Sequence, residues 1–179
     1  MRITGGHLGG HRYNPPLKNW PTRPTTDFSR EAIFNILYNR YDLNDCDFLD
    51  LFGGTGSNSY EFLSRGGNSA TYVEQYGKAI SYVQEFSKKL DIQEQLQIYR
   101  GDVFKFIKTC KSKFDIIIAD PPYDLKKLET LPSLVFEHEL LKENGVLIIE
   151  HDKTFDLTVK EHFKEQRKYG STLFSFYKH

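Results

Sequence analysis

A proline-stiffened turn, Asp120-Pro121-Pro122-Tyr123, is the segment whose residue types most directly predict chemistry. The Asp120 carboxylate and the Pro121 carbonyl could accept both N–H bonds of a planar amine and favour a pyramidal, nucleophilic nitrogen. Because each proline fixes its own φ, these two acceptors would be pre-positioned. Tyr123 could stack on an extruded base. We therefore predict that the four residues are catalytic. The alternative is that they form only a rigid turn at the end of a strand.

A second signal is the glycine-rich segment that follows the apolar run at residues 48–52. Glycines at a strand-to-helix turn let the backbone approach a ligand closely and expose amide donors. Glu74 ends the next strand-like segment, where a carboxylate can accept hydrogen bonds from both hydroxyls of a ribose. This pattern fits either a dinucleotide or S-adenosylmethionine (SAM). Residues 54–59 lack the third glycine of the dinucleotide fingerprint, which favours SAM.

Further candidate cofactor contacts follow the third strand-like segment. The Asp102 carboxylate could accept from an adenine amino group, or could serve only as the N-cap of the next helix, and Val103 could cover the adenine ring. An aromatic ring at position 123 would also attract a sulfonium by a cation–π interaction. The predicted cofactor contacts from these segments are Asp50, Phe52, Gly53, Gly54, Thr55, Gly56, Glu74, Asp102 and Val103.

The elements that must position these residues alternate between strand and helix patterns. Strands are expected at residues 2–4, 11–14, 48–52, 70–73, 96–99, 114–119 and 146–149, with two more around Gly170. Helices are expected at residues 27–38, 60–64, 78–90, 103–110, 128–141 and 155–163. From residue 47 onward this alternation predicts an α/β fold whose largely parallel sheet is covered on both faces. The polar signals follow the strands, which is where such sheets bind ligands.

The composition is that of a soluble globular domain, and no stretch is long or apolar enough to span a bilayer. The N-terminus lacks a signal-peptide pattern, so we expect a cytoplasmic protein. Cys46 and Cys110 have no metal-ligand spacing, and we predict two reduced thiols and no metal site. Residues 1–40 carry six basic and two acidic side chains, and residues 160–179 carry five and two. Basic ends on an acidic body suggest contact with a polyanion, although basic termini are also often only solvated.

Taken together, the motifs resemble the bacterial RsmD-type methyltransferases, which modify guanine N2 of small-subunit (16S) ribosomal RNA. The resemblance covers nearly the whole chain. The shared segments are Arg2-Ile3-x-Gly5, Thr22-Arg23-Pro24-Thr25-Thr26-Asp27, Arg30-Glu31-Ala32-x-Phe34-Asn35-x-Leu37, Leu49-Asp50-Leu51-Phe52-Gly53-Gly54-Thr55-Gly56, Leu63-Ser64-Arg65-Gly66, Val73-Glu74, Asp120-Pro121-Pro122-Tyr123 and Lys168-Tyr169-Gly170.

This resemblance implies a class I, Rossmann-like SAM-methyltransferase fold, with a mostly parallel seven-stranded sheet and a C-terminal antiparallel hairpin. Residues 1–26 would form a small N-terminal extension, an RNA-contacting hairpin and connector, and residues 27–179 the methyltransferase domain. In such proteins the segment around Arg23 and Thr25 lies beside the methionine end of SAM, so both are expected to bind the cofactor carboxylate or the RNA. Thr25 and Thr26 could instead only cap a helix.

The implied function is SAM-dependent methylation of the N2 amine of one guanine of 16S rRNA. The partner would be that RNA within the small ribosomal subunit or its assembly intermediate, and we expect a monomer. Arginine and lysine side chains would contact phosphates, and histidine could add stacking. The candidate RNA contacts are Arg2, His11, Arg12, Lys18, Arg23 and Arg30.

The chain departs from the family pattern at three places. Gln75 stands where an acidic residue is usual, Phe28 stands where a basic residue is usual, and the helix after the glycine turn begins with the polar residues 57–59. The first and third departures concern fine contacts to SAM, and the second concerns an RNA contact. None of them removes the predicted catalytic or ribose-binding residues.

Three other functions stay open. The same turn chemistry would serve adenine N6 in DNA or the side-chain amide of a protein glutamine. DNA methyltransferases generally carry a separate target-recognition region, for which 179 residues leave no room. A non-catalytic rRNA-binding assembly factor is the third alternative, and the intact glycine turn, Glu74 and residues 120–123 argue against it.

Overall fold

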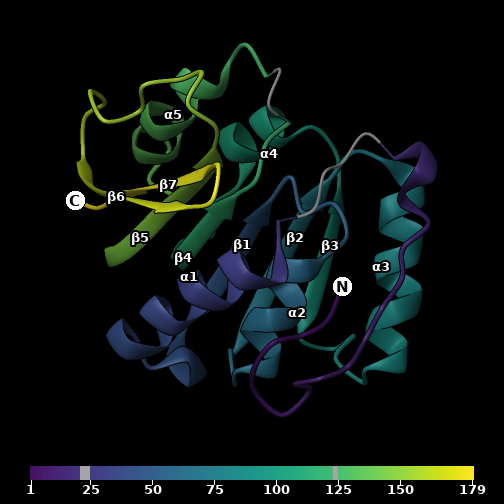
Figure 1. The fold of residues 1–179 in the computed structure, drawn as a ribbon. Helices are drawn as coiled ribbons and strands as arrows, with labels where there is room; N and C mark the ends of the chain where they lie inside the picture. Colours follow the sequence, from purple (N-terminus) through teal and green to yellow (C-terminus); the bar gives the residue numbers. More distant parts are fainter. Residues whose placement is uncertain (21–24, 123–124) are drawn as a thin grey trace.

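Seven strands form one sheet in the computed structural model, which describes residues 1–20, 25–122 and 125–179. Their order is β3-β2-β1-β4-β5-β7-β6 (Figure 1). The first five strands in this order are parallel, and β7 is antiparallel to both of its neighbours. The strands are β1 (Asp47–Leu51), β2 (Ser69–Glu74), β3 (Leu96–Arg100), β4 (Phe114–Ala119), β5 (Leu141–His151), β6 (Phe163–Tyr169) and β7 (Thr172–Tyr177).

The described residues also form five α-helices and three short 3-10 helices, some before β1 and the others between strands. None of these helices is long and apolar enough to cross a bilayer. The α-helices are α1 (Asp27–Arg40), α2 (Ser57–Ser64), α3 (Gly77–Lys89), α4 (Val103–Thr109) and α5 (Leu131–Glu137). The 3-10 helices are η1 (Leu17–Asn19), η2 (Leu43–Asp45) and η3 (Leu128–Thr130).

Side chains of successive strand residues point to opposite faces of the sheet, so each strand contributes to two cores. Ile116 and Ile118 of β4 pack in one cluster, which also holds buried residues of α1, α2 and α3. Ile117 packs in the other cluster, with buried residues of α4 and α5. The sheet is therefore covered on both faces, and the predicted α/β architecture is confirmed.

The register aligns the ends of four neighbouring strands. Val73 pairs with Leu51, Leu51 with Ala119, and Ala119 with Ile149. The residues that follow these four, Phe52, Glu74, Asp120 and Glu150, therefore lie at one common edge of the sheet. This carboxyl edge is where parallel sheets bind ligands.

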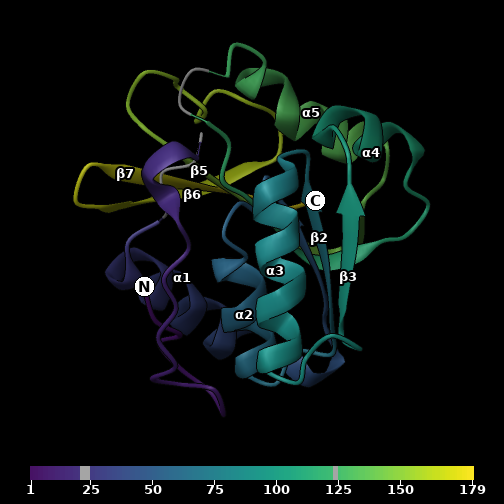
Figure 2. The same cartoon turned by 90° about the vertical axis from the view of Figure 1, so that its right-hand side faces the viewer.

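Residues 1–20 of the N-terminal extension run along the outside of the helical layer formed by α1, α2 and α3 (Figure 2). Within residues 1–20, the strand pairing is one isolated antiparallel bridge, between Arg2 and Arg12, instead of the two strands predicted. Ile3, Leu8 and Tyr13 are buried in the same core as these helices. The extension is therefore an integral part of the fold.

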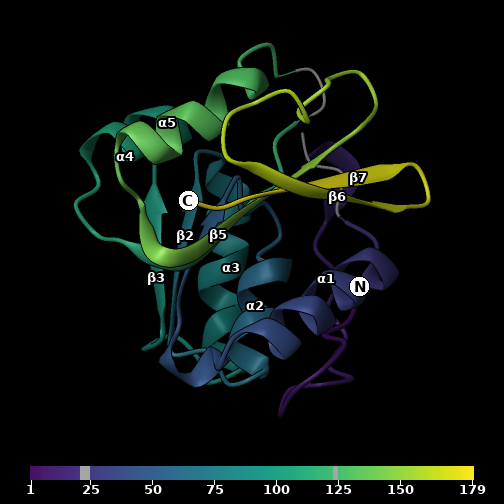
Figure 3. The same cartoon turned by 90° about the vertical axis from the view of Figure 1, so that its left-hand side faces the viewer.

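Towards the C-terminus the expectations were partly wrong. The β6–β7 hairpin around Gly170 is confirmed (Figure 3), but residues 155–163 do not form the predicted helix and instead make turns before β6. Asp152 and Asp156 accept from the backbone N–H groups of Thr154 and Thr158, both at 3.0 Å or less. Such local bonds offer the backbone an alternative to helix.

The segment from residue 128 to 141 also differs from the prediction. Pro132 lies in the first turn of α5, where a proline is tolerated, so the helix starts there and is preceded by η3. α5 ends at Glu137, and β5 already begins at Leu141, five residues before the strand start that the sequence predicts.

Candidate functional site

The turn after β1 has three residues in the left-handed region of backbone conformation. Gly54 and Gly56 have φ values of 50° and 79°, and Phe52 itself has φ 60°. A Cβ atom on Gly53 would lie 2.3 Å from Cδ2 of Tyr72, so the chain passes directly over that ring. The Tyr72 hydroxyl donates to the Gly54 carbonyl at 2.7 Å. Tyr72 thus supports the turn from β2.

Glu74 holds the glycine turn and the loop after β2 together. Its Oε2 accepts from the Gly54 N–H at 3.1 Å, and its Oε1 accepts from the N–H groups of Gln75 and Tyr76, each at 2.8 Å. A carboxylate has about four acceptor positions, so these amides leave roughly one for a ligand. The structure therefore gives Glu74 a loop-organising role beside its predicted contact with ribose.

Asp50 is fully buried at the end of β1. Its Oδ2 accepts from the Ser59 N–H at 3.2 Å and from the Ser59 hydroxyl at 2.6 Å, which ties the start of α2 to the sheet. Its Oδ1 has no hydrogen-bond partner among the described residues. Burial raises the pKa of Asp50 to about 7, because the bonds from Ser59 only partly offset the cost of removing the charge from water.

Asp120 begins the loop after β4, next to the glycine turn. Its N–H donates to the Leu51 carbonyl at 3.2 Å, which extends the pairing of β4 with β1 by one residue. The side chain is half-buried, and burial raises its pKa to about 7, although a hydrogen bond from Thr25 opposes this. The predicted acceptor thus lies one strand away from the predicted cofactor turn.

Thr25 connects Asp120 to a second carboxyl group. Its hydroxyl oxygen lies 3.0 Å from Oδ2 of Asp120 and 2.5 Å from Oε2 of Glu150. Glu150 is 3% exposed, and both burial and repulsion from Asp120 raise its pKa well above the usual range. Sequence reasoning missed Glu150, although the residue directly follows the apolar run of β5, as Glu74 follows that of β2.

Asp102 caps α4, because its side chain accepts from the Lys105 N–H at 2.9 Å. Val103 is buried in the core beneath that helix. The centroid of the neighbouring Phe104 ring is 6.2 Å from the centroid of the Phe52 ring. Nζ of Lys127 lies 6.0 Å from the same Phe104 centroid. The capping interpretation of Asp102 is confirmed, and the adenine contacts of Asp102 and Val103 stay predictions.

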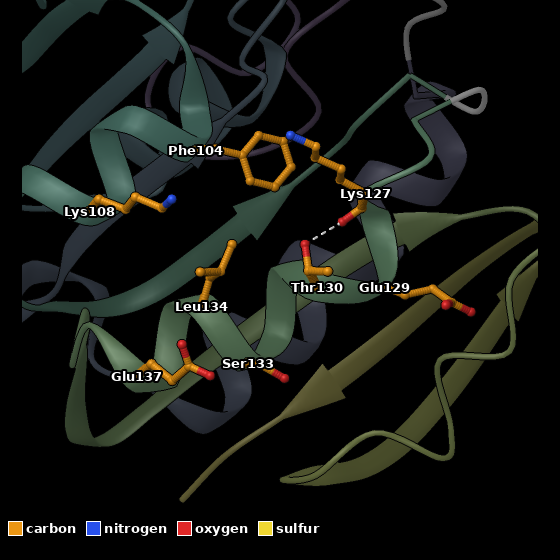
Figure 4. Close-up of a pocket in the computed structure, with 8 residues that line it drawn as sticks. All are labelled: Phe104, Lys108, Lys127, Glu129, Thr130, Ser133, Leu134 and Glu137. Carbon is orange, nitrogen blue, oxygen red and sulfur yellow. Dashed lines mark hydrogen bonds between the residues drawn. The ribbon is translucent and has the colours of Figure 1, made fainter.

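Phe104 and Lys127 also line a cavity of about 410 Å³ between α4 and α5 (Figure 4). The picture shows that both side chains lie on one side of this cavity. Its opposite wall, on α5, includes Ser133, Leu134 and Glu137. The mixture of charges on these walls favours no single ligand class.

The structure brings most of the predicted site residues to one edge of the sheet. The glycine turn, Glu74 and Asp120 lie at the ends of aligned strands. Thr25, two residues before α1, contacts Asp120 through its hydroxyl group. Pro121 follows Asp120 and is buried, and Thr55 is buried within the turn. The predictions for Arg23 and Tyr123 fall on residues outside the described part of the chain, and Pro122 is exposed.

One of the RNA-contact predictions is wrong. Arg30 is only 1% exposed, and its guanidinium donates to the Arg2 carbonyl and to Asp27, each at 2.6 Å. Its Nε lies 3.5 Å from Oε2 of Glu61 on α2. It therefore joins elements inside the protein instead of reaching a phosphate. Four described RNA candidates are exposed: Arg2, His11, Arg12 and Lys18.

A family model described as Conserved hypothetical protein 95 matches residues 1–178. YlbH of Bacillus subtilis (strain 168) is 34% identical over 184 residues, covering 99% of this chain and 98% of that protein. The protein named Ribosomal RNA small subunit methyltransferase D from Haemophilus influenzae (strain ATCC 51907 / DSM 11121 / KW20 / Rd) is 28% identical over 166 residues, covering 91% and 84%.

Solved structures share the fold. The Escherichia coli protein yhhF superposes with a TM-score of 0.84 at 24% identity, covering 99% of this chain and 96% of that chain. An RNA methyltransferase from Salinibacter ruber, in complex with S-adenosyl-L-homocysteine, gives a TM-score of 0.68 at 13% identity and covers 87% and 92%. With the match over residues 1–178, the strand order and the relatives above, the chain belongs to the RsmD-type methyltransferase family and has its Rossmann-like, class I fold.

Proposed function

We propose that this protein is a SAM-dependent methyltransferase that modifies the exocyclic N2 amine of a guanine in 16S ribosomal RNA of the small subunit. One observation carries the proposal. Asp120, the predicted acceptor for the amine, begins a loop whose backbone bonds to Leu51, two residues before the glycine turn. An amine held by Asp120 would therefore lie beside a cofactor held by that turn.

The residues of the carboxyl edge fit SAM. Gly53, Gly54 and Gly56 carry no side chains, so a ligand could approach the backbone of the turn closely. Oδ1 of Asp50 is buried without a partner among the described residues, and an ammonium group is a donor that would satisfy it. Glu74 keeps about one acceptor position for a hydroxyl. When bound, SAM supplies a methyl group on a positively charged sulfur.

The chain's own residues would hold and activate the amine. The lone pair of an exocyclic amine is delocalised into its base, so the nitrogen is a poor nucleophile. The Asp120 carboxylate and the Pro121 carbonyl would accept its two N–H bonds and favour a pyramidal nitrogen. Transfer makes this nitrogen cationic. The Asp120 carboxylate would stabilise that positive charge and then take up the proton that the nitrogen releases, for later transfer to water.

The choice of substrate rests on the relatives. Several are named Ribosomal RNA small subunit methyltransferase D, which supports ribosomal RNA over DNA or a protein amide. Guanine N2 follows from the resemblance of the motifs to the RsmD type. Exposed basic side chains on the N-terminal extension would supply phosphate contacts.

Replacement of Asp120 tests the catalytic assignment. We expect Asp120→Ala to retain its affinity for SAM, measured by calorimetry. The rate of methyl transfer to the small subunit should fall at least about 100-fold, because an acceptor that acts in the transition state is removed. Glu143→Ala, which removes an exposed carboxylate of β5, is the matched control and should leave both values unchanged. Near-normal turnover of the Asp120 variant would contradict the assignment.

The modified atom is tested separately. We expect nucleoside mass spectrometry of 16S rRNA from a strain that lacks the gene to show the loss of one N2-methylguanosine, restored by adding the protein and SAM to the subunits. A restored N6-methyladenosine would contradict the guanine assignment while leaving the role of Asp120 intact.

A further inference from the structure

The position of Thr25 limits the protonation of two carboxyl groups. Its hydroxyl oxygen lies within hydrogen-bond distance of both Asp120 and Glu150. A hydroxyl has one proton to donate but two lone pairs with which to accept. If both carboxyl groups were ionised, neither could donate, and one of the two contacts would join unprotonated oxygens. Both contacts can be hydrogen bonds only when one carboxyl group carries a proton and donates it to Thr25.

The surroundings indicate that Glu150 carries this proton. Glu150 lies on an inner strand of the sheet, between β4 and β7, and pairs with Phe174 on β7. Among the described residues, the charged groups that act on it are Asp120 after β4, which raises its pKa, and Arg30 on α1, whose smaller effect lowers it. Asp120 is half-buried and lies at the open edge. The more accessible group is the one that can stay ionised at lower cost.

We propose that Glu150 is a positioning residue that acts as a neutral acid: it donates to Thr25, and the Thr25 hydroxyl then donates to Oδ2 of Asp120. This arrangement holds the Asp120 carboxylate in one orientation and leaves Oδ1 free to accept an N–H of the substrate amine. The inference rests on the proposed function, because it assigns a purpose to the orientation of Asp120.

A pH dependence follows from this chain of donors. When Glu150 ionises at high pH, it becomes an acceptor and competes with Asp120 for the Thr25 proton. Asp120 then loses its fixed orientation and faces a second negative charge. When Asp120 is protonated, below a pH of about 7, it no longer presents a carboxylate to the amine. The rate should therefore fall on both sides of an optimum, with Glu150 responsible for the alkaline side.

Two substitutions of Glu150 separate a neutral donor from a carboxylate. Glu150→Gln keeps a donor, because its amide N–H can reach Thr25, and we expect kcat within about threefold of the parent with no alkaline decline. Glu150→Ala removes the donor, and we expect kcat to fall about 100-fold through misplacement of Asp120. SAM affinity by calorimetry and KM for the small subunit should be unchanged in both variants.

A third variant controls for a folding defect. Thr25→Val keeps the shape of the side chain but removes the hydroxyl, and it should lower kcat as much as Glu150→Ala while its thermal unfolding matches that of the parent. The proposal is overturned if Glu150→Gln is as slow as Glu150→Ala, or if Glu150→Gln keeps the alkaline decline. It is also overturned if Glu150→Ala and Thr25→Val both turn over normally.

Failure of the proposed function would give a different pattern of variant activities. If Asp120→Ala turns over normally, Asp120 is not the acceptor, whatever the Glu150 variants do. If Asp120→Ala is inactive while Thr25→Val and Glu150→Ala are normal, the function stands and only the positioning role is lost.

Discussion

At the scale of single residues, Asp50 makes the free energy of unfolding depend on pH. Its folded-state pKa of about 7 lies above the ordinary value of 3.8. Between these values the folded protein binds a proton that the unfolded chain has released, so this group's contribution to stability falls as the pH rises through that window. Asp50→Asn removes the titration and still offers an oxygen to Ser59. We expect the slope of unfolding free energy against pH to become more positive by up to roughly 1.4 kcal/mol per pH unit.

Urea unfolding at pH 5, 6, 7 and 8, followed by circular dichroism, measures this slope. The control is Asp47→Asn. Lys142 and other hydrogen-bond donors hold the pKa of Asp47 below its usual range, so its stabilisation is lost only as the pH falls through that lowered value. The Asp47 variant should therefore leave the slope between pH 5 and 7 unchanged. Equal slopes for Asp50→Asn and the parent would show that Asp50 is ionised in the folded protein.

At the scale of elements, regular periodicity made most of the sheet predictable. β4 is an almost continuous apolar run, and its two faces enter two cores as expected for a central strand. The turns at residues 152–162 were not predictable from apolar spacing. Leu157 is buried, as a helix stripe would require, but the Tyr177 hydroxyl donates to its backbone carbonyl at 2.8 Å. That contact comes from the last strand, and local sequence carries no information about it.

The candidate site was also predictable from the sequence only in part. Strand ends identified Glu74 and Asp120, because a polar residue after an apolar run is visible in the sequence. The link from Thr25 to Glu150 spans 125 residues and depends on how α1 packs against the sheet. The burial of Arg30 was equally hidden, because its acidic partner Glu61 lies on a helix whose packing the sequence does not specify.

Arg30 gives a prediction at the element scale, because it holds the N-terminal extension, α1 and α2 together. Arg30→Met would keep most of the side-chain volume but remove the donors to the Arg2 carbonyl and to Asp27. We expect a loss of about 3 kcal/mol in unfolding free energy, the lower end for breaking a buried ion pair, because Glu61 keeps Arg65 at 2.7 Å.

Arg12→Met is the matched control for this experiment. Arg12 is exposed, so the same substitution there should change the unfolding free energy by no more than about 0.5 kcal/mol. Urea unfolding of both variants gives the comparison. A similar small change at position 30 would mean that the buried contacts of Arg30 do not support the fold.

At the scale of the whole molecule, the N-terminal extension carries exposed basic residues along the outside of the fold (Figure 2). His7 and Leu8 bond to Ser64, the last residue of α2, whereas η1 lies farther along the chain towards the carboxyl edge. Deletion of residues 1–14 would remove buried side chains as well as charges. It would therefore unfold part of the core and could not isolate an RNA contact, which makes surface substitutions the appropriate test.

Neutralising Arg12 and Lys18 together should weaken small-subunit binding without affecting SAM binding. Each phosphate contact contributes about one unit to the slope of log K against log salt, so Arg12→Gln/Lys18→Gln should reduce that slope by up to about two. Lys88→Gln/Lys111→Gln makes the same change in net charge at exposed positions on α3 and after α4. An equal effect of this control would mean that net charge, and not the path of the extension, determines binding. A slope unchanged in both double variants would place the phosphate contacts elsewhere on the surface.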